Sequence, residues 1–289
     1  MLELITQQLA NGLVLGSTYA LVALGLTLVF GVLLIPNFAH GEFYMAGAFI
    51  TYTLAMSGVN FWVAMVLSVM LVMLLGCLID RLAFFPIRTA PALSLMISAL
   101  AMSIILQQIA TIIWGTEART IPTPLPGVIR TTYFAITYLQ LAILLSLAIA
   151  ALAVWMILYH SRLGLAIRAT AQNRDAAALM GIRMNVVRTS TFAISAALGA
   201  IAGALLGATF PIYPTMGSIP VLKAFVVLVL GGIGSFWGAI LGGLFLGTSE
   251  VFVAGYISSQ LQDIGTFLLL TMVLLVRPQG LFGRVNMER

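Results

Sequence analysis

The stretch HSRLGLAIRATAQNRDAAALMGIRMNVVR, residues 160–188, separates two long apolar runs and carries most of the charge between them. It holds five arginines against a single acid, Asp175. A polar segment of this size in an apolar chain is expected to lie in water, because charged side chains are costly in lipid. Its basic bias is typical of a cytoplasmic loop. The five arginines are Arg162, Arg168, Arg174, Arg183 and Arg188.

The rest of the chain is apolar enough to lie in a membrane. Of its 289 residues, 62% are hydrophobic and only 7% are charged, whereas soluble domains carry about 25% charged residues. The apolar runs have the length of helices, and lipid admits only helices or closed barrels. Barrel strands would instead alternate over segments of about ten residues. The sequence therefore predicts an all-α integral membrane protein, with one transmembrane domain over residues 1–289.

Eight apolar runs predict membrane-spanning helices, and a short ninth run at 221–230 either crosses or re-enters the membrane. The expected count is therefore about 8–9 helices, some broken by Pro or Gly, as at Pro36. The connection at about 115–136 is rich in proline and is expected to be an external, non-helical loop. The eight runs are 9–34, 38–57, 61–78, 92–114, 139–159, 189–210, 236–253 and 264–276.

The distribution of Lys and Arg predicts the orientation. The first residues, MLELITQQLANG, contain neither, so the N-terminus is expected outside and the first apolar run is expected to be a retained helix rather than a signal peptide. Alternating from there puts three basic regions inside, which predicts a multi-pass membrane protein with these regions in the cytoplasm. These regions are Arg81 with Arg88, the loop 160–188, and Arg277 with Arg284 and Arg289.

Asn37, His40 and Glu42 are polar residues beside or within an apolar run. They are costly there unless they face protein or a water-filled cavity, so they are candidates for a translocation pathway. A half-helix that begins near them could attract a carboxylate. The alternative is that these residues lie at the membrane edge, satisfied by caps and water. A Gly-rich span followed by a Pro-broken segment recurs at 9–48 and 190–232, as in transporters built from repeats.

Three further charged residues lie in the C-terminal third. Lys223 sits in a short apolar stretch, where it either snorkels to the interface or contacts a solute. Glu250 and Asp263 flank a turn between two spans and are interpreted as interfacial residues.

Enzymatic chemistry is not expected. The chain has two histidines, no HExxH pattern and no phosphate-binding GxxxxGK[ST] loop, so no catalytic or metal site is predicted. The net charge of +5 could suggest nucleic acid, but the basic residues fit cytoplasmic loops better. Cys77 lies in an apolar run and is interpreted as a small buried side chain.

The loop 160–188 has its own local signals. Residues 165–171 are expected to form a short helix along the membrane face. Asn173 and Asp175 are N-cap types, Ala176–Met180 favours helix, and Gly181 is a typical C-terminal stop. These signals suggest a compact docking helix, while composition alone equally fits a solvated loop.

The sequence resembles the permease subunits of branched-chain amino acid ABC importers, the Liv-type permeases. The resembling segments follow the expected order over nearly the whole chain, and the motif NFAHGE at 37–42 is among the most specific. These segments are 16–31, 37–42 with 45–47, 164–169, 171–175, 181–182, 229–235 and 277–283.

The resemblance implies a multi-component importer in the lipid bilayer, with this chain as a multi-pass protein of the bacterial inner membrane. It implies a second permease subunit, more readily a related heterodimer partner than an identical copy. It also implies two cytoplasmic ATPase subunits, which bind the ATP and Mg, and a periplasmic substrate-binding protein. This chain would bind no cofactor, and its loop would couple to the ATPases. The implied coupling residues are Gly164, Arg168, Ala169, Asn173, Arg174, Asp175, Gly181 and Ile182.

Two matters stay open at this point. The competing function is an ion-coupled secondary transporter, which would need acids deep in the membrane. The substrate is also open, because relatives with this pattern handle branched-chain amino acids, other amino acids, urea or short amides.

Overall fold

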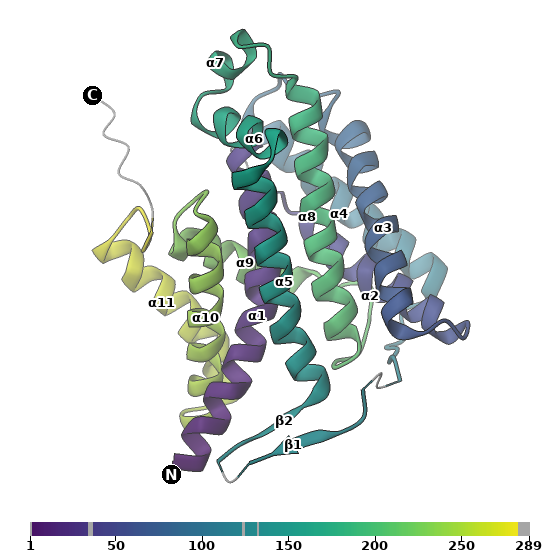
Figure 1. Ribbon diagram of the computed structural model, residues 1–289, viewed down its shortest axis with the longest axis vertical. Helices are drawn as coiled ribbons and strands as arrows, with labels where there is room; N and C mark the ends of the chain where they lie inside the picture. Colours follow the sequence, from purple (N-terminus) through teal and green to yellow (C-terminus); the bar gives the residue numbers. More distant parts are fainter. Residues whose placement is uncertain (1, 34–36, 123–124, 132, 283–289) are drawn as a thin grey trace.

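The computed structural model describes residues 2–33, 37–122, 125–131 and 133–282 (Figure 1). Pro36, Gly283, Arg284 and Arg289 lie outside the described residues. The helices are α1 (Leu2–Leu33), α2 (His40–Met56), α3 (Phe61–Ile79), η1 (Asp80–Phe84), α4 (Ala92–Trp114), α5 (Tyr138–His160), α6 (Arg162–Gln172), α7 (Arg174–Leu179), α8 (Met184–Gly207), α9 (Ser218–Gly231), α10 (Phe236–Tyr256), η2 (Ser259–Leu261) and α11 (Gln262–Val276). One antiparallel hairpin pairs β1 (Val128–Arg130) with β2 (Ala135–Thr137).

Nine helices correspond to the nine predicted runs. Seven of them are long and apolar enough to cross a membrane, namely α1, α3 with η1, α4, α5, α8, α10 and η2 with α11. The other two, α2 and α9, have only 17 and 14 residues. The prediction of an all-α membrane protein is confirmed, and the short hairpin lies in the external loop that was expected to be non-helical.

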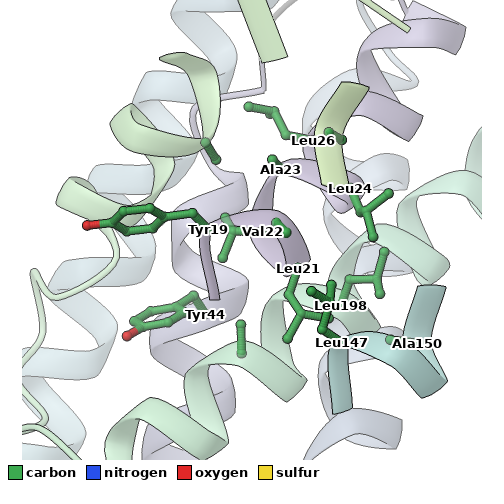
Figure 2. Close-up of a cluster of buried hydrophobic side chains, with 14 of the residues drawn as sticks. Tyr19, Leu21, Val22, Ala23, Leu24, Leu26, Tyr44, Leu147, Ala150 and Leu198 are labelled. Carbon is green, nitrogen blue, oxygen red and sulfur yellow. The ribbon is translucent and has the colours of Figure 1, made fainter. Parts of the chain in front are cut away.

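The core forms around the C-terminal half of α1. Leu21, Leu24 and Leu26 are almost completely buried, and Leu147 of α5 and Leu198 of α8 pack in the same cluster. Figure 2 shows these side chains together, with the hydroxyls of Tyr19 and Tyr44 pointing to the same side of the cluster. By contrast, α3, α4, α5 and α11 leave many large apolar side chains exposed, as helices that contact lipid or another subunit do.

Small residues let the central helices approach closely. Three glycines spaced four residues apart on α8, Gly199, Gly203 and Gly207, face α2. A Cβ atom at Gly203 would lie 1.9 Å from the carbonyl oxygen of Tyr44, so no larger residue fits between these backbones. Close helix contact of this kind replaces the hydrophobic effect as the main source of stability within lipid.

The basic segments gather at one end of the molecule. In Figure 1 the helices α6 and α7 lie at the top, whereas the N-terminus and the β-hairpin lie at the bottom. The Arg88 guanidinium donates a hydrogen bond to Asn185 (3.3 Å), which ties the connection after η1 to the end of the loop. The backbone amide of Leu281 donates to the carbonyl of Leu230 (2.8 Å), so the C-terminal segment packs at the end of α9. This grouping agrees with the predicted orientation.

Two segments differ from the prediction. Residues Asp80–Phe84 form a π-helix that continues α3, where a polar connection was expected. The helix α8 begins at Met184 instead of residue 189, and it therefore includes Arg188. Both differences have the same cause, because Asp80 and Arg188 pair with each other inside the protein.

Candidate functional site

Two short helices begin inside the molecule and meet there. The first residues of α2 and α9 contact each other backbone to backbone: a Cβ atom at Gly41 would lie 2.4 Å from the carbonyl oxygen of Gly217, and one at Gly217 would lie 2.0 Å from that of Gly41. We call this contact the half-helix junction. It lies deep in the membrane, because His40 bonds to Ser195, which is about 17 Å from either end of α8 at ~1.5 Å per residue.

The junction combines two positive helix ends. The amide groups in the first turn of a helix have no partner within the helix, so each N-terminus carries a partial positive charge. The two interrupted segments predicted at 9–48 and 190–232 are the ones that supply these helix starts. Such paired half-helices are typical of solute sites near the membrane centre.

His40 holds the junction in place. Its side chain is completely buried, with Nε2 2.9 Å from the carbonyl oxygen of Val22 and Nδ1 3.0 Å from Oγ of Ser195. Its ring also packs against Gly25, where a Cβ atom would lie 2.6 Å from the imidazole. Both ring nitrogens are therefore engaged, one as donor and one as acceptor. These contacts fasten α2 to α1 and α8 and leave no ring nitrogen free for a solute.

Glu42 lies in the first turn of α2 and is only 1% exposed. Its Oε1 accepts hydrogen bonds from Oγ of Ser103 and Nε2 of Gln107, both at 2.8 Å. The same Gln107 nitrogen lies 3.4 Å from Oγ of Ser218, the first residue of α9. This polar cluster thus connects α4 to both half-helices. Asn37 is also 1% exposed, and its Oδ1 accepts from the backbone amide of Ala39 (3.1 Å).

Lys223 is buried in an ionic network, so the expectation that it snorkels to the interface is wrong. Its ammonium group donates to Glu250, to Oδ1 of Asp263 (2.7 Å) and to Oγ1 of Thr266 (3.2 Å). Tyr19 donates to the other oxygen of Glu250 at 2.8 Å. The interfacial interpretation is wrong for Glu250, which is buried, whereas the side chain of Asp263 is 73% exposed. A buried lysine is acceptable here because carboxylates neutralise it.

The helix α6 lies against the end of α5. Ser161 caps it by accepting from the backbone amide of Gly164 (2.9 Å), and a Cβ atom at Gly164 would lie 2.1 Å from the carbonyl oxygen of Ile157. The guanidinium of Arg168 stacks over the ring of Tyr159 at 4.9 Å. Gly164 and Arg168 therefore pack against α5 of the same chain, and Ala169 is half-buried.

The helix α7 projects beyond the membrane helices with the predicted cap and stop. Asn173 caps it by accepting from the amide of Ala176 (2.9 Å), while Arg174 and Asp175 are exposed in its first turn. Gly181 ends the turn with φ of +82°, and the amides of Gly181 and Ile182 donate to the carbonyls of Ala178 and Ala177. These two hydrogen bonds together form a Schellman motif at the C-terminus of α7.

Two apolar side chains on this projection were missed by sequence reasoning. Leu179 is 89% exposed and Met180 is 83% exposed, at the C-terminal end of α7. They are adjacent in the sequence and lie on the same loop as the exposed charged residues Arg174 and Asp175. The signal in the sequence was their position directly before the Gly181 stop.

Arg188, counted among the loop arginines, is buried at the start of α8. Its Nε lies 2.6 Å from Oδ1 of Asp80, with the N–H turned away from that oxygen, so the contact is an ion pair rather than a hydrogen bond. Oγ1 of Thr189 donates to the other carboxylate oxygen at 2.6 Å. The pair joins the ends of α3 and α8 directly beneath the loop.

Comparison with known proteins identifies the architecture. The family model described as "Branched-chain amino acid transport system / permease component" matches residues 8–276. The chain belongs to this permease family. The permease is 40% identical to the high-affinity branched-chain amino acid transport system permease protein BraD of Pseudomonas aeruginosa, covering 98% of this chain and 97% of BraD.

Two further relatives show the same match over most of their length. LivH of Escherichia coli, with the same description as BraD, is 39% identical over 98% of the permease and 97% of LivH. A probable branched-chain amino acid transport permease protein LivH of Methanocaldococcus jannaschii is 27% identical over 95% of the permease and 91% of that protein. The predicted family, membrane location and transport role are confirmed. The matches favour a subunit of a transport system over the alternative of an ion-coupled secondary transporter.

Among the described residues, no group of three or more His, Cys, Asp or Glu side chains could hold a metal ion. Of the charged side chains that are buried in this part of the chain, four form ion pairs, Asp80 with Arg188 and Lys223 with Glu250. The fifth, Glu42, accepts hydrogen bonds from Ser103 and Gln107 instead.

Proposed function

We propose that the permease is the membrane subunit of an ATP-driven importer of branched-chain amino acids. Its named relatives belong to branched-chain amino acid transport systems, and it matches them over nearly its full length. The observation that carries the proposal is the α7 projection, which presents Leu179 and Met180 to a partner at the same end as the basic segments.

The partner at this projection is an ATPase subunit, and the complex holds two of them. The exposed residues Asn173, Arg174, Asp175 and Gly181 form a helix with fixed ends, which suits docking into a groove. Gly164, Arg168 and Ala169 have a different part in coupling: they hold α6 against α5, so that a force on α7 reaches the membrane helices. ATP and Mg bind to the ATPases and not to this chain.

The remaining partners are a second permease subunit and a periplasmic binding protein. The exposed apolar faces of α3, α4 and α5 leave room for a related permease beside lipid. The hairpin β1–β2 lies at the end opposite α7, where the binding protein would deliver its solute. The solute then passes along Asn37 and Glu42 at the half-helix junction, while His40 and Lys223 maintain the positions of α2 and α9.

The function is tested by reconstituting the permease with its partner permease, ATPases and binding protein in proteoliposomes. We expect ATP-dependent uptake of labelled leucine, and little uptake of labelled urea or acetamide. Uptake by the permease alone, driven by an ion gradient without ATP, would refute the proposal.

The docking surface is tested in the same complex with the double variant Leu179→Asp/Met180→Asp. Burying each of these side chains in a partner contributes roughly 1.5–3 kcal/mol, so the affinity for the ATPase should fall about 100-fold or more. The control is Val128→Asp, an exposed apolar residue of the hairpin, which should leave ATPase co-purification unchanged. Equal ATPase recovery with both proteins would show that α7 is not the docking element.

A further inference from the structure

The buried acidic side chains of the permease differ in their counter-ions. Glu42, Asp80 and Glu250 are each at most 1% exposed. Asp80 lies against Arg188, and Glu250 lies against Lys223. Among the residues that the structure describes, Glu42 forms no ion pair. A buried carboxylate without a cation is costly, so this site lacks one positive group.

The surroundings of Glu42 hold one oxygen and leave the other free. Ser103 and Gln107 donate to Oε1, whereas Oε2 has no hydrogen-bond partner within the described part of the chain. The starts of α2 and α9 both lie next to it and favour negative charge, but each supplies only a partial charge. Ser103 and Gln107 are half-buried on α4, so the polar cluster continues from Glu42 toward the surface of that helix.

A free donor accompanies this free acceptor. The Nδ2 group of Asn37 is also buried and has no partner in the described residues, although its Oδ1 is bonded to the amide of Ala39. A free carboxylate oxygen and a free amide N–H thus flank the same helix start. They match the two charged groups of an α-amino acid zwitterion, whose ammonium needs an acceptor and whose carboxylate needs a donor.

We propose that Glu42 binds the α-ammonium group of the amino acid in passage through its free Oε2, as the missing counter-ion of this carboxylate. Asn37 donates from Nδ2 to the carboxylate of the same solute. The inference rests on the proposed function, and it adds a selectivity step inside the permease. Urea and short amides carry no ammonium group, so they leave Glu42 unpaired and are disfavoured at this point of the pathway.

The test uses Glu42→Gln and Glu42→Asp in the reconstituted complex. Gln keeps the shape and an oxygen that accepts from Ser103 and Gln107, but removes the negative charge. Asp keeps the charge on a shorter arm. Because a hydrogen-bonded charge pair is lost, leucine uptake should fall about tenfold or more with Gln. With Asp it should fall less. The ATPase subunits and the partner permease should co-purify with both variants as they do with the unchanged protein, which reports an intact complex.

The outcomes separate this inference from the proposed function. If the unchanged complex imports leucine and Glu42→Gln imports it equally well, a neutral side chain suffices and the inference is overturned. The inference is also overturned if Asp is worse than Gln, because shape rather than charge then matters. If the unchanged complex imports no amino acid, the proposed function fails irrespective of either variant. Asn37→Ala should raise the leucine concentration needed for half-maximal uptake, while the ATPase subunits still co-purify with the variant.

Discussion

Breaking the Asp80–Arg188 pair on one side should destabilise the permease strongly. Both side chains are almost fully excluded from solvent, with 0% and 5% exposure, and their nearest atoms are 2.6 Å apart. Removal of one partner of such a pair leaves a buried unpaired charge, which costs about 3–5 kcal/mol. The N–H is turned away from Oδ1, so the pair lacks the best hydrogen-bond geometry, and the lower end of this range is expected for Arg188→Met. Asp80→Asn keeps an acceptor for Thr189 but removes the charge opposite Arg188.

The double variant Asp80→Asn/Arg188→Met distinguishes the loss of the ion pair from the cost of leaving one charge buried without its partner. It leaves no charge behind, so it should be more stable than either single variant, by about 1–3 kcal/mol. The assay is reversible unfolding of the purified permease in mixed micelles, followed by tryptophan fluorescence. The control is Arg88→Gln. Both Arg88 (4.5 Å) and Arg188 (5.1 Å) lie over the ring of Phe85, but Arg88 is exposed. Its substitution should therefore lower the free energy of unfolding by less than about 1 kcal/mol. A double variant as unstable as the sum of the two single variants would refute a direct pairing.

Two further predictions concern the helix contacts. Gly203→Ala places a Cβ atom 1.9 Å from the carbonyl oxygen of Tyr44, so α2 and α8 must separate. The yield of folded protein in size-exclusion chromatography should therefore fall severalfold. The control Gly31→Ala should fold normally, because the new atom has open space around it. Lys223→Met leaves Glu250 buried and unpaired and should cost about 3–5 kcal/mol in the same unfolding assay, with part of the loss recovered by adding Glu250→Gln; a Lys223→Met protein as stable as the unchanged one would contradict the buried network.

Local signals in the sequence predicted local structure well. The cap at Asn173 and the stop at Gly181 act within one short helix, so their chemistry alone determines where α7 begins and ends. The helix count followed from hydropathy for the same reason, because a run of apolar residues of sufficient length needs no distant partner to be helical in lipid. The specific motif at 37–42 identified the family but not the contacts its residues make.

Partners distant in the chain were beyond sequence reasoning. Arg188 was placed in the water-exposed loop because nothing near it in sequence neutralises its charge, and its partner Asp80 is more than 100 residues away. Lys223 and Glu250 were misjudged for a similar reason, since Lys223 appeared isolated in an apolar stretch and Glu250 was assigned to a turn between two spans. His40 was identified as unusual, yet only the structure shows that both of its ring nitrogens are used to hold helices together.

The helix α8 gives these contacts a common consequence. It runs without a break from Met184, shortly after α7, to Gly207, and along it lie Arg188 beneath the loop and Ser195 at the half-helix junction. Since an α-helix moves as a stiff rod over such a length, a displacement of α7 that reaches Met184 also moves Ser195, and with it His40 and the start of α2. The Asp80–Arg188 pair fixes the upper end of this rod to α3. In the proposed mechanism, docking at α7 and solute passage at the junction are therefore joined by one helix, and the Asp80–Arg188 pair lies near the start of that helix.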